Sequence, residues 1–180
     1  FCIFNHIAIA ARYAQKKYGV GKVLIVDWDV HHGNGTQDVF YEDDSVFFLS
    51  THQAPWYPGT GKKEETGKGK GLGHTLNCPL PAGSGRSEIV EGAFGGELLK
   101  KIVGFRPELI LVSAGFDSRM GDPLGQFRLE DRDFSDLTKL IVDLAKEHCE
   151  GKVVSILEGG YDLDGLAKAA TAHFKALLAP

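Results

Sequence analysis

The stretch Val23-Leu-Ile-Val-Asp27-Trp-Asp29-Val-His31-His32-Gly33-Asn34-Gly35 decides the fold of this chain and locates its chemistry. Its first four residues are apolar and mostly β-branched, and the run is bounded by glycines, which predicts a short buried strand. Asp27, Asp29 and His31 follow at a spacing of two, which places them on one side of an extended chain. Because unpaired buried charge is costly, we expect a metal or a partner to bind there.

Strands and helices alternate along the rest of the chain. Further strands are expected over residues 46–49, 75–80, 109–112 and 153–157. Helices are expected over residues 5–18, 37–41, 87–103, 131–149 and 163–178. This alternation predicts an α/β fold with a mainly parallel sheet and right-handed crossovers. A chain of 180 residues is most simply a single domain, residues 1–180.

Local signals define some of these boundaries. Asn5 and Ser87 are expected to cap the helices that follow them. Pro79 and Pro81 keep the strand between Thr75 and Leu80 out of the centre of a sheet. Glycine, proline and lysine dominate residues 54–73, so we expect a long loop there.

Polar residues follow several of the expected strands, where ligands bind in parallel α/β sheets. Asp29, His31 and Asp117 offer two carboxylates and one imidazole, a set suited to zinc or another borderline divalent metal. A turn-forming role stays open for Asp117. Tyr161 follows two glycines, and either an exposed hydroxyl or a core aromatic ring fits that pattern. His32 points away from His31 in an extended chain and is expected to be a hydrogen-bonded structural histidine.

Composition excludes several classes of function. The net charge of −4 argues against direct nucleic-acid binding, which normally needs a basic excess. No apolar run approaches the length of a membrane span, and no signal-peptide pattern is present at the start. Three cysteines without a CxxC pair fit a reducing compartment, so a cytoplasmic location is expected.

One alternative is a magnesium-dependent phosphatase. Asp27-x-Asp29 after an apolar strand resembles the nucleophile motif of haloacid-dehalogenase-type hydrolases, in which the first Asp attacks phosphorus. Ser113 fits the strand-end serine of those enzymes, but no later acidic pair follows a suitable strand. His31-His32-Gly33 is also left unexplained, so this alternative ranks low.

The motifs taken together resemble those of the zinc-dependent histone deacetylases and the bacterial deacetylase-like amidohydrolases. The matching segments appear in the family's order: Phe1-Cys2-x-x-Asn5, Asp27 to Gly35, Tyr57-Pro-Gly-Thr-Gly61, Asn77-Cys-Pro-Leu80, Ser113-Ala-Gly-Phe-Asp117, Asp122-Pro-Leu124 and Leu157-Glu-Gly-Gly-Tyr161. Asn34 in place of Asp, together with the Glu158-Gly-Gly-Tyr161 form, resembles class II members.

The resemblance implies the arginase/deacetylase fold and hydrolysis of the acetyl amide of acetyl-lysine or a related acylated amine. It makes Asp29, His31 and Asp117 ligands of Zn²⁺, and it assigns the Tyr161 hydroxyl to the developing oxyanion. The same resemblance makes Phe1 and Tyr57 the aromatic walls of a substrate channel, with Leu124 at its rim. Gly159 and Gly160 are assigned to substrate binding. Leu124 favours acyl-lysine over acetylated polyamines, which are selected by an acidic rim residue.

Potassium sites are implied by the same resemblance. Oxygen atoms of one potassium site come from Asp27, Asp29, His31, Ser50 and Thr51. Carbonyl groups of a second site come from Phe40, Asp43 and Val46.

Members of the family carry a Gly-His-His element upstream of the segment that starts at Phe1, and the general base belongs to that element. Asp27 and Asn34 orient its two histidines by the same resemblance. We therefore expect a partial, N-terminally truncated catalytic domain that is weak or inactive in isolation. A noncatalytic acyl-lysine-binding pseudoenzyme is the alternative, and homo-oligomerisation stays open.

Overall fold

Five parallel strands form one sheet in the order β3-β2-β1-β4-β5 in the computed structural model, which describes residues 3–179. The strands are β1 (Val23–Asp27), β2 (Val46–Gln53), β3 (Thr75–Leu80), β4 (Leu109–Ala114) and β5 (Val153–Leu157). The α-helices are α1 (His6–Tyr18), α2 (Asn34–Phe40), α3 (Leu99–Ile102), α4 (Asp131–Cys149) and α5 (Leu163–Leu177). A 3₁₀ turn, η1 (Gly69–Gly71), and a π-helical segment, η2 (Ser87–Leu98), complete the regular structure. The predicted α/β fold with a parallel sheet is confirmed.

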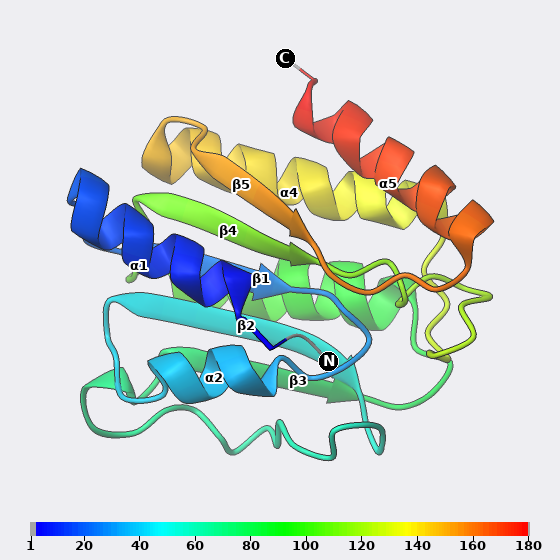
Figure 1. Ribbon diagram of the computed structural model, residues 1–180, viewed down its shortest axis with the longest axis horizontal. Coiled ribbons are helices and arrows are strands. Elements are labelled where there is room, and N and C mark those ends of the chain that lie inside the picture. Colours follow the sequence, from blue (N-terminus) through cyan, green and yellow to red (C-terminus); the bar gives the residue numbers. More distant parts are fainter. Residues whose placement is uncertain (1–2, 180) are drawn as a thin grey trace.

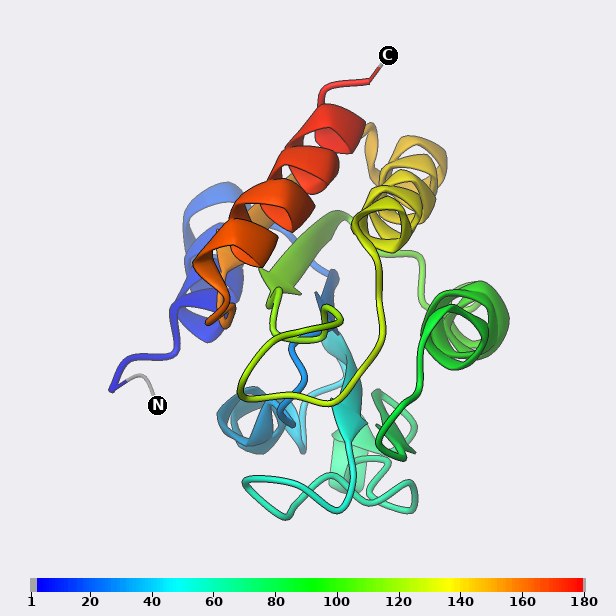
Figure 2. The same cartoon turned by 90° about the vertical axis from the view of Figure 1, so that its right-hand side faces the viewer.

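Helices cover both faces of the sheet. Figure 2 shows α1 and α2 on one side, with α4 and the segment formed by η2 and α3 on the other. Leu24 and Val26 of β1 pack into the larger core, which η2 and α4 also line. Val23 and Ile25 point to the opposite face and pack with α1. Each buried aliphatic side chain of this size contributes about 1.5–3 kcal/mol, so β1 anchors both cores.

The strand order reverses beside β1. From β1 the chain moves outward through β2 to β3, then returns to place β4 on the other side of β1. Asp27 at the end of β1 lies in register with Ser113 of β4. The loops after these two strands therefore begin side by side at a topological switch point, where ligands bind in sheets of this kind. In Figure 1 these loops leave the arrowheads on the same side of the molecule.

β3 and β5 are the two edge strands of the sheet. β3 is an edge strand, as its prolines predict. β5 forms the other edge and exposes Val154 and Leu157.

Within residues 3–179, no helix combines the length and the apolarity that crossing a membrane requires.

Most boundaries agree with the sequence, but one cap is wrong. Asn5 caps α1 as predicted, because its side-chain oxygen accepts the N–H of Ala8 at 2.9 Å. Ser87 does not cap a helix, since the preceding residue, Arg86, already has helical dihedral angles. The Ser87 hydroxyl instead donates to the carboxylate of Glu88. The expected α-helix over 87–103 is also mostly π-helical.

Candidate metal centre

The chain turns sharply at the end of β1. The Asp27 carboxylate accepts the N–H of Asp29 at 3.0 Å, and the Asp29 carboxylate accepts the N–H of His31 at 2.8 Å. These are two successive turns of the kind that aspartate side chains form with the backbone two residues on. The prediction that Asp27, Asp29 and His31 share one side of an extended chain is therefore wrong. Asp27 is buried against Gly33, where any β-carbon would collide with its carboxylate.

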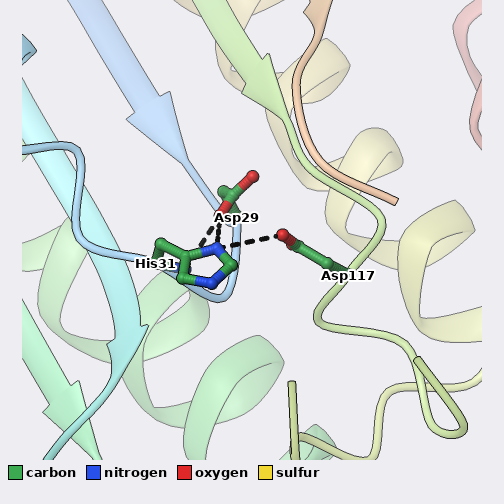
Figure 3. A group of neighbouring side chains, drawn as sticks. All are labelled: Asp29, His31 and Asp117. Atoms are coloured by element: carbon green, nitrogen blue, oxygen red, sulfur yellow. Dashed lines mark hydrogen bonds and ion pairs between the residues drawn. The ribbon is translucent and has the colours of Figure 1, made fainter. Parts of the chain in front are cut away.

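Asp29, His31 and Asp117 come together, with one possible ligand atom from each residue within 4.8 Å of the others. His31 Nδ1 lies 2.9 Å from an oxygen of Asp29 and 3.2 Å from an oxygen of Asp117. Figure 3 shows the three side chains pointing toward one another from the loops after β1 and β4. The topological switch point thus brings together two segments almost ninety residues apart in the chain.

The donor set fits a divalent cation such as zinc. Asp117 is fully buried, and its Oδ2 is a buried oxygen without a hydrogen bond of good geometry, facing the His31 ring. Its other oxygen accepts the N–H of Val30 at 2.9 Å, which orients the carboxylate. Two carboxylates and an imidazole are ligands that zinc accepts, and three protein ligands leave a position for water or substrate. A cation bound between the three side chains would compensate the charge of the buried Asp117 carboxylate, which otherwise faces the His31 ring.

The protonation behaviour of the cluster also indicates concentrated negative charge. Burial, followed by the nearby charge of Asp29, raises the pKa of Asp117 to about 7. Burial lowers the pKa of His31, but its close contacts with the carboxylates of Asp117 and Asp29 outweigh that effect and raise it to about 9. Burial and then repulsion from Asp29 and Glu158 raise the pKa of Asp27 well above its usual range. A bound dication would relieve this repulsion.

The loop that precedes Tyr161 lies directly against the candidate metal centre. The N–H of Gly159 donates to Asp29 Oδ2 at 2.9 Å, and the Gly159 carbonyl accepts the N–H of Phe116 at 2.7 Å. Gly160 has φ +142°, a conformation that other residues rarely adopt. Tyr161 is 39% exposed, which excludes the core-aromatic interpretation.

The expected channel residues lie in two neighbouring loops. Tyr57 is exposed, and its ring centroid lies 6.2 Å from that of His31 in an edge-on arrangement. Leu124 is 41% exposed, and its carbonyl accepts the indole N–H of Trp56 at 2.9 Å. Sequence reasoning missed Trp56, although an aromatic residue beside Tyr57 in a Pro- and Gly-rich loop was a signal. Phe1 lies outside the described residues.

His32 and Asn34 occupy quite different environments. His32 is buried and hydrogen-bonded to Thr60 and Gln37, at 2.7 and 3.0 Å, as expected of a structural histidine. Its ring lies against that of His52, with 4.6 Å between centroids. Asn34 is the first residue of α2 and is exposed.

The residues expected to hold potassium fall into two groups. Ser50 and Thr51 are buried on β2 beside Asp27, and the Thr51 hydroxyl donates to the Asp27 carbonyl at 3.5 Å. Phe40, Asp43 and Val46 lie around the connection from α2 to β2. The Asp43 carboxylate is already paired with Arg12 and hydrogen-bonded to Ser45, and these interactions lower the pKa of Asp43 despite its partial burial. Both potassium sites stay predictions.

The phosphatase alternative places its nucleophile on Asp27. That side chain is only 4% exposed, and its carboxylate is occupied by the N–H of Asp29. An attacking carboxylate must reach the phosphorus of a substrate. The geometry therefore disfavours this alternative.

Comparisons with known proteins agree with the fold described above. The family model described as "Histone deacetylase domain" matches residues 1–177. Histone deacetylase 14, chloroplastic, of Arabidopsis thaliana is 49% identical over 178 residues, which are 99% of this chain and 42% of that protein. A probable deacetylase of Archaeoglobus fulgidus is 43% identical over 166 residues, 92% of this chain and 45% of that protein. Polyamine deacetylase HDAC10 of Homo sapiens is 43% identical over 184 residues, 99% of this chain and 27% of that protein.

Solved structures give the same result. The crystal structure of the HDA15 HD domain superposes with a TM-score of 0.92 at 43% sequence identity, covering 99% of this chain and 50% of that chain. The structure of the histone deacetylase Clr3 superposes with a TM-score of 0.90 at 39% identity, covering 98% of this chain and 30% of that chain. This chain spans less than half the length of the three curated relatives named above. Its arginase/deacetylase fold and its match to the family model show that the chain belongs to the histone deacetylase domain family.

Proposed function

We propose that this chain supplies the metal-binding part of the active site of a zinc-dependent deacetylase. The proposed substrate is the acetyl amide of acetyl-lysine or a related acylated amine. Residues 1–180 would form a single, partial catalytic domain of that enzyme. The observation that carries the proposal is the convergence of Asp29, His31 and Asp117, whose ligand atoms lie within 4.8 Å of one another. The loop that leads to Tyr161 is hydrogen-bonded to the same Asp29.

Each residue has a defined task in this proposal. Asp29, His31 and Asp117 hold Zn²⁺, which when bound polarises the amide carbonyl and acidifies a water molecule. The Tyr161 hydroxyl donates to the oxygen on which negative charge develops, a type of stabilisation that often accounts for much of an enzyme's rate enhancement. Tyr57 presents its ring beside His31, where it contacts the aliphatic stem of the substrate.

The base that takes a proton from the attacking water is proposed to be a histidine of the full-length protein beyond this segment. His32 is buried, and both of its ring nitrogens have hydrogen-bond partners. His52 is buried too, and its ring nitrogens face the Ser50 hydroxyl and the Gly61 carbonyl. A general base must reach the proton that it removes, which neither ring is placed to do.

The substrate class follows from the rim. Among the relatives, some are named histone deacetylases and one is named a polyamine deacetylase. Leu124 is exposed and apolar, so it attracts no second cation of a polyamine. Acyl-lysine, whose stem is a single aliphatic chain, is therefore the proposed preference.

The full-length protein tests the proposal in one assay. Zinc-loaded protein should hydrolyse an acetyl-lysine peptide, lose activity with a chelator and regain it with added zinc. Tyr161→Phe should keep its zinc and lose roughly 100-fold or more in kcat, because one oxyanion donor is removed. Peptide binding without hydrolysis would establish the pseudoenzyme instead, and magnesium-dependent cleavage of a phosphate ester would restore the phosphatase.

A further inference from the structure

Asp122 lies in the loop between β4 and α4, outside the cluster of metal ligands, and only 7% of it is exposed. Its Oδ2 accepts the backbone N–H groups of Tyr161 and Asp162, at 2.7 and 3.2 Å. Its Oδ1 accepts the N–H of Leu124 at 2.8 Å. One carboxylate therefore joins the backbone of the channel rim to the backbone of Tyr161, 39 residues further along.

This arrangement holds the segment from Gly159 to Asp162 on both sides of Gly160. On the metal side, the segment is held at Gly159, whose N–H donates to Asp29. Gly160 follows at φ +142°, and glycine has the widest backbone freedom of any residue. Beyond Gly160, the carboxylate of Asp122 holds the N–H of Tyr161 itself. Hydrogen bonds to a carboxylate are among the stronger ones in proteins, so Asp122 fixes the position of the Tyr161 backbone N–H.

We propose that Asp122 is a positioning residue that holds Tyr161 against the metal centre and Leu124 at the channel rim. The proposal rests on the function proposed above for Tyr161. Asp122 acts through the two segments that it joins, and it is not a metal ligand or a proton donor. A misplacement of a catalytic group by about 1 Å costs on the order of 100-fold in rate, so the effect of losing Asp122 should fall on kcat.

The rim end of this link has a second attachment. The Leu124 carbonyl accepts the indole N–H of Trp56 at 2.9 Å, which ties the rim to the loop that carries Tyr57. Leu124 therefore keeps one anchor when Asp122 is replaced, whereas the N–H groups of Tyr161 and Asp162 both lose the carboxylate that accepts them. Loss of Asp122 should thus change kcat far more than KM.

The experiment compares Asp122→Asn and Asp122→Ala in the full-length protein. Asn keeps one acceptor oxygen and Ala keeps none, so kcat should fall by about 10-fold and about 100-fold respectively, with KM within about twofold. Zinc content should stay at the wild-type value. Hydrogen exchange of the Tyr161 and Asp162 amides should become at least about tenfold faster, while exchange in β1 and β4 stays slow.

A double-mutant cycle separates positioning from general destabilisation. In a Tyr161→Phe background, Asp122→Asn should reduce kcat little further, because the hydroxyl that it positions is already gone. Asp133→Asn is the matched control: Asp133 is another buried carboxylate that accepts a backbone N–H, here from Glu130 at 2.8 Å, and it pairs with Arg86. Its kcat should equal that of the wild type.

Two results would overturn the proposal. One is unchanged hydrogen exchange of the Tyr161 amide in Asp122→Asn. The other is a decrease in kcat caused by Asp122→Asn that is as large in the Tyr161→Phe background as in the wild type. Failure of the proposed function is recognised separately. If the wild-type protein hydrolyses no acetyl-lysine, that function is wrong, and amide exchange alone then decides whether Asp122 holds Tyr161.

Discussion

Asp29 Oδ2 accepts the N–H of Gly159 at 2.9 Å, across 130 positions of sequence. One carboxylate thus joins the candidate metal-binding cluster to the loop that leads to Tyr161. Its other oxygen accepts the N–H of His31 at 2.8 Å, so both oxygens of Asp29 are oriented by backbone groups. A metal ligand whose orientation is set by surrounding hydrogen bonds binds its ion more tightly than a free side chain.

Gly159→Ala should lower zinc affinity by about tenfold or more. A β-carbon at position 159 would collide with Asp117 Oδ2 and would lie 2.7 Å from Asp29 Oδ2, so both ligands must move. Competition with a chelating dye measures the affinity. Gly104→Ala is the matched control, because nothing lies within 4 Å of a β-carbon there. Equal zinc affinities for both variants would contradict the assigned site.

Asp117→Asn should abolish zinc binding and yet stabilise the metal-free protein. Burial, then the charge of Asp29, raises the pKa of Asp117 to about 7, so its charge is unfavourable without a cation. An amide keeps the acceptor for the N–H of Val30 and removes that charge. Urea unfolding in chelator and in zinc measures both effects. A variant less stable than the wild type in chelator would show that the Asp117 charge is not the destabilising element.

His173 should make the protein less stable as the pH falls. It is buried between α4 and β5, near the hydroxyls of Thr138 and Ser155, and burial lowers its pKa to about 4 from 6.5. The unfolded chain therefore binds a proton more readily than the folded protein between these values. The contribution of His173 is complete above pH 6.5 and is lost as the pH falls toward 4, by up to about 1.4 kcal/mol per pH unit.

His173→Phe tests this pH dependence. A phenyl ring keeps the edge-on packing against Trp28 and Phe116 but cannot titrate. Urea unfolding from pH 4.5 to 7.5 should show a smaller dependence of the unfolding free energy on pH than in the wild type. Equal slopes would mean that His173 does not take up the proton.

Leu124→Glu should shift substrate preference toward acetylated polyamines. Leu124 is exposed and its backbone is fixed at both the N–H and the carbonyl, so a carboxylate there would face solvent at the proposed channel rim. That carboxylate would attract a second ammonium group of a polyamine at low salt. The ratio of kcat/KM for an acetylpolyamine to that for an acetyl-lysine peptide should rise about tenfold. Leu124→Gln is the uncharged control, and a similar rise in that variant would argue against an electrostatic cause.

Local sequence patterns were enough to predict the strands, one helix cap and the candidate metal ligands of this protein. Apolar runs located all five strands, and the Asn5 cap was correct, because burial periodicity and capping depend on a few adjacent residues. Polar residues at strand ends also singled out Asp29, His31 and Asp117, since the carboxyl ends of parallel strands meet at one edge of a sheet.

Tertiary structure alone decided which groups those side chains contact. The sequence placed Asp27 on the same side of an extended chain as Asp29 and His31, but the turn that its own carboxylate forms directs that carboxylate against Gly33. Asp122 was visible only as part of a motif, and its link to Tyr161 was not. A carboxylate accepts a hydrogen bond from any N–H within reach, so its partner depends on which segments pack beside it. Asp29 meets Gly159, 130 residues away, and Asp122 meets Tyr161, 39 residues away.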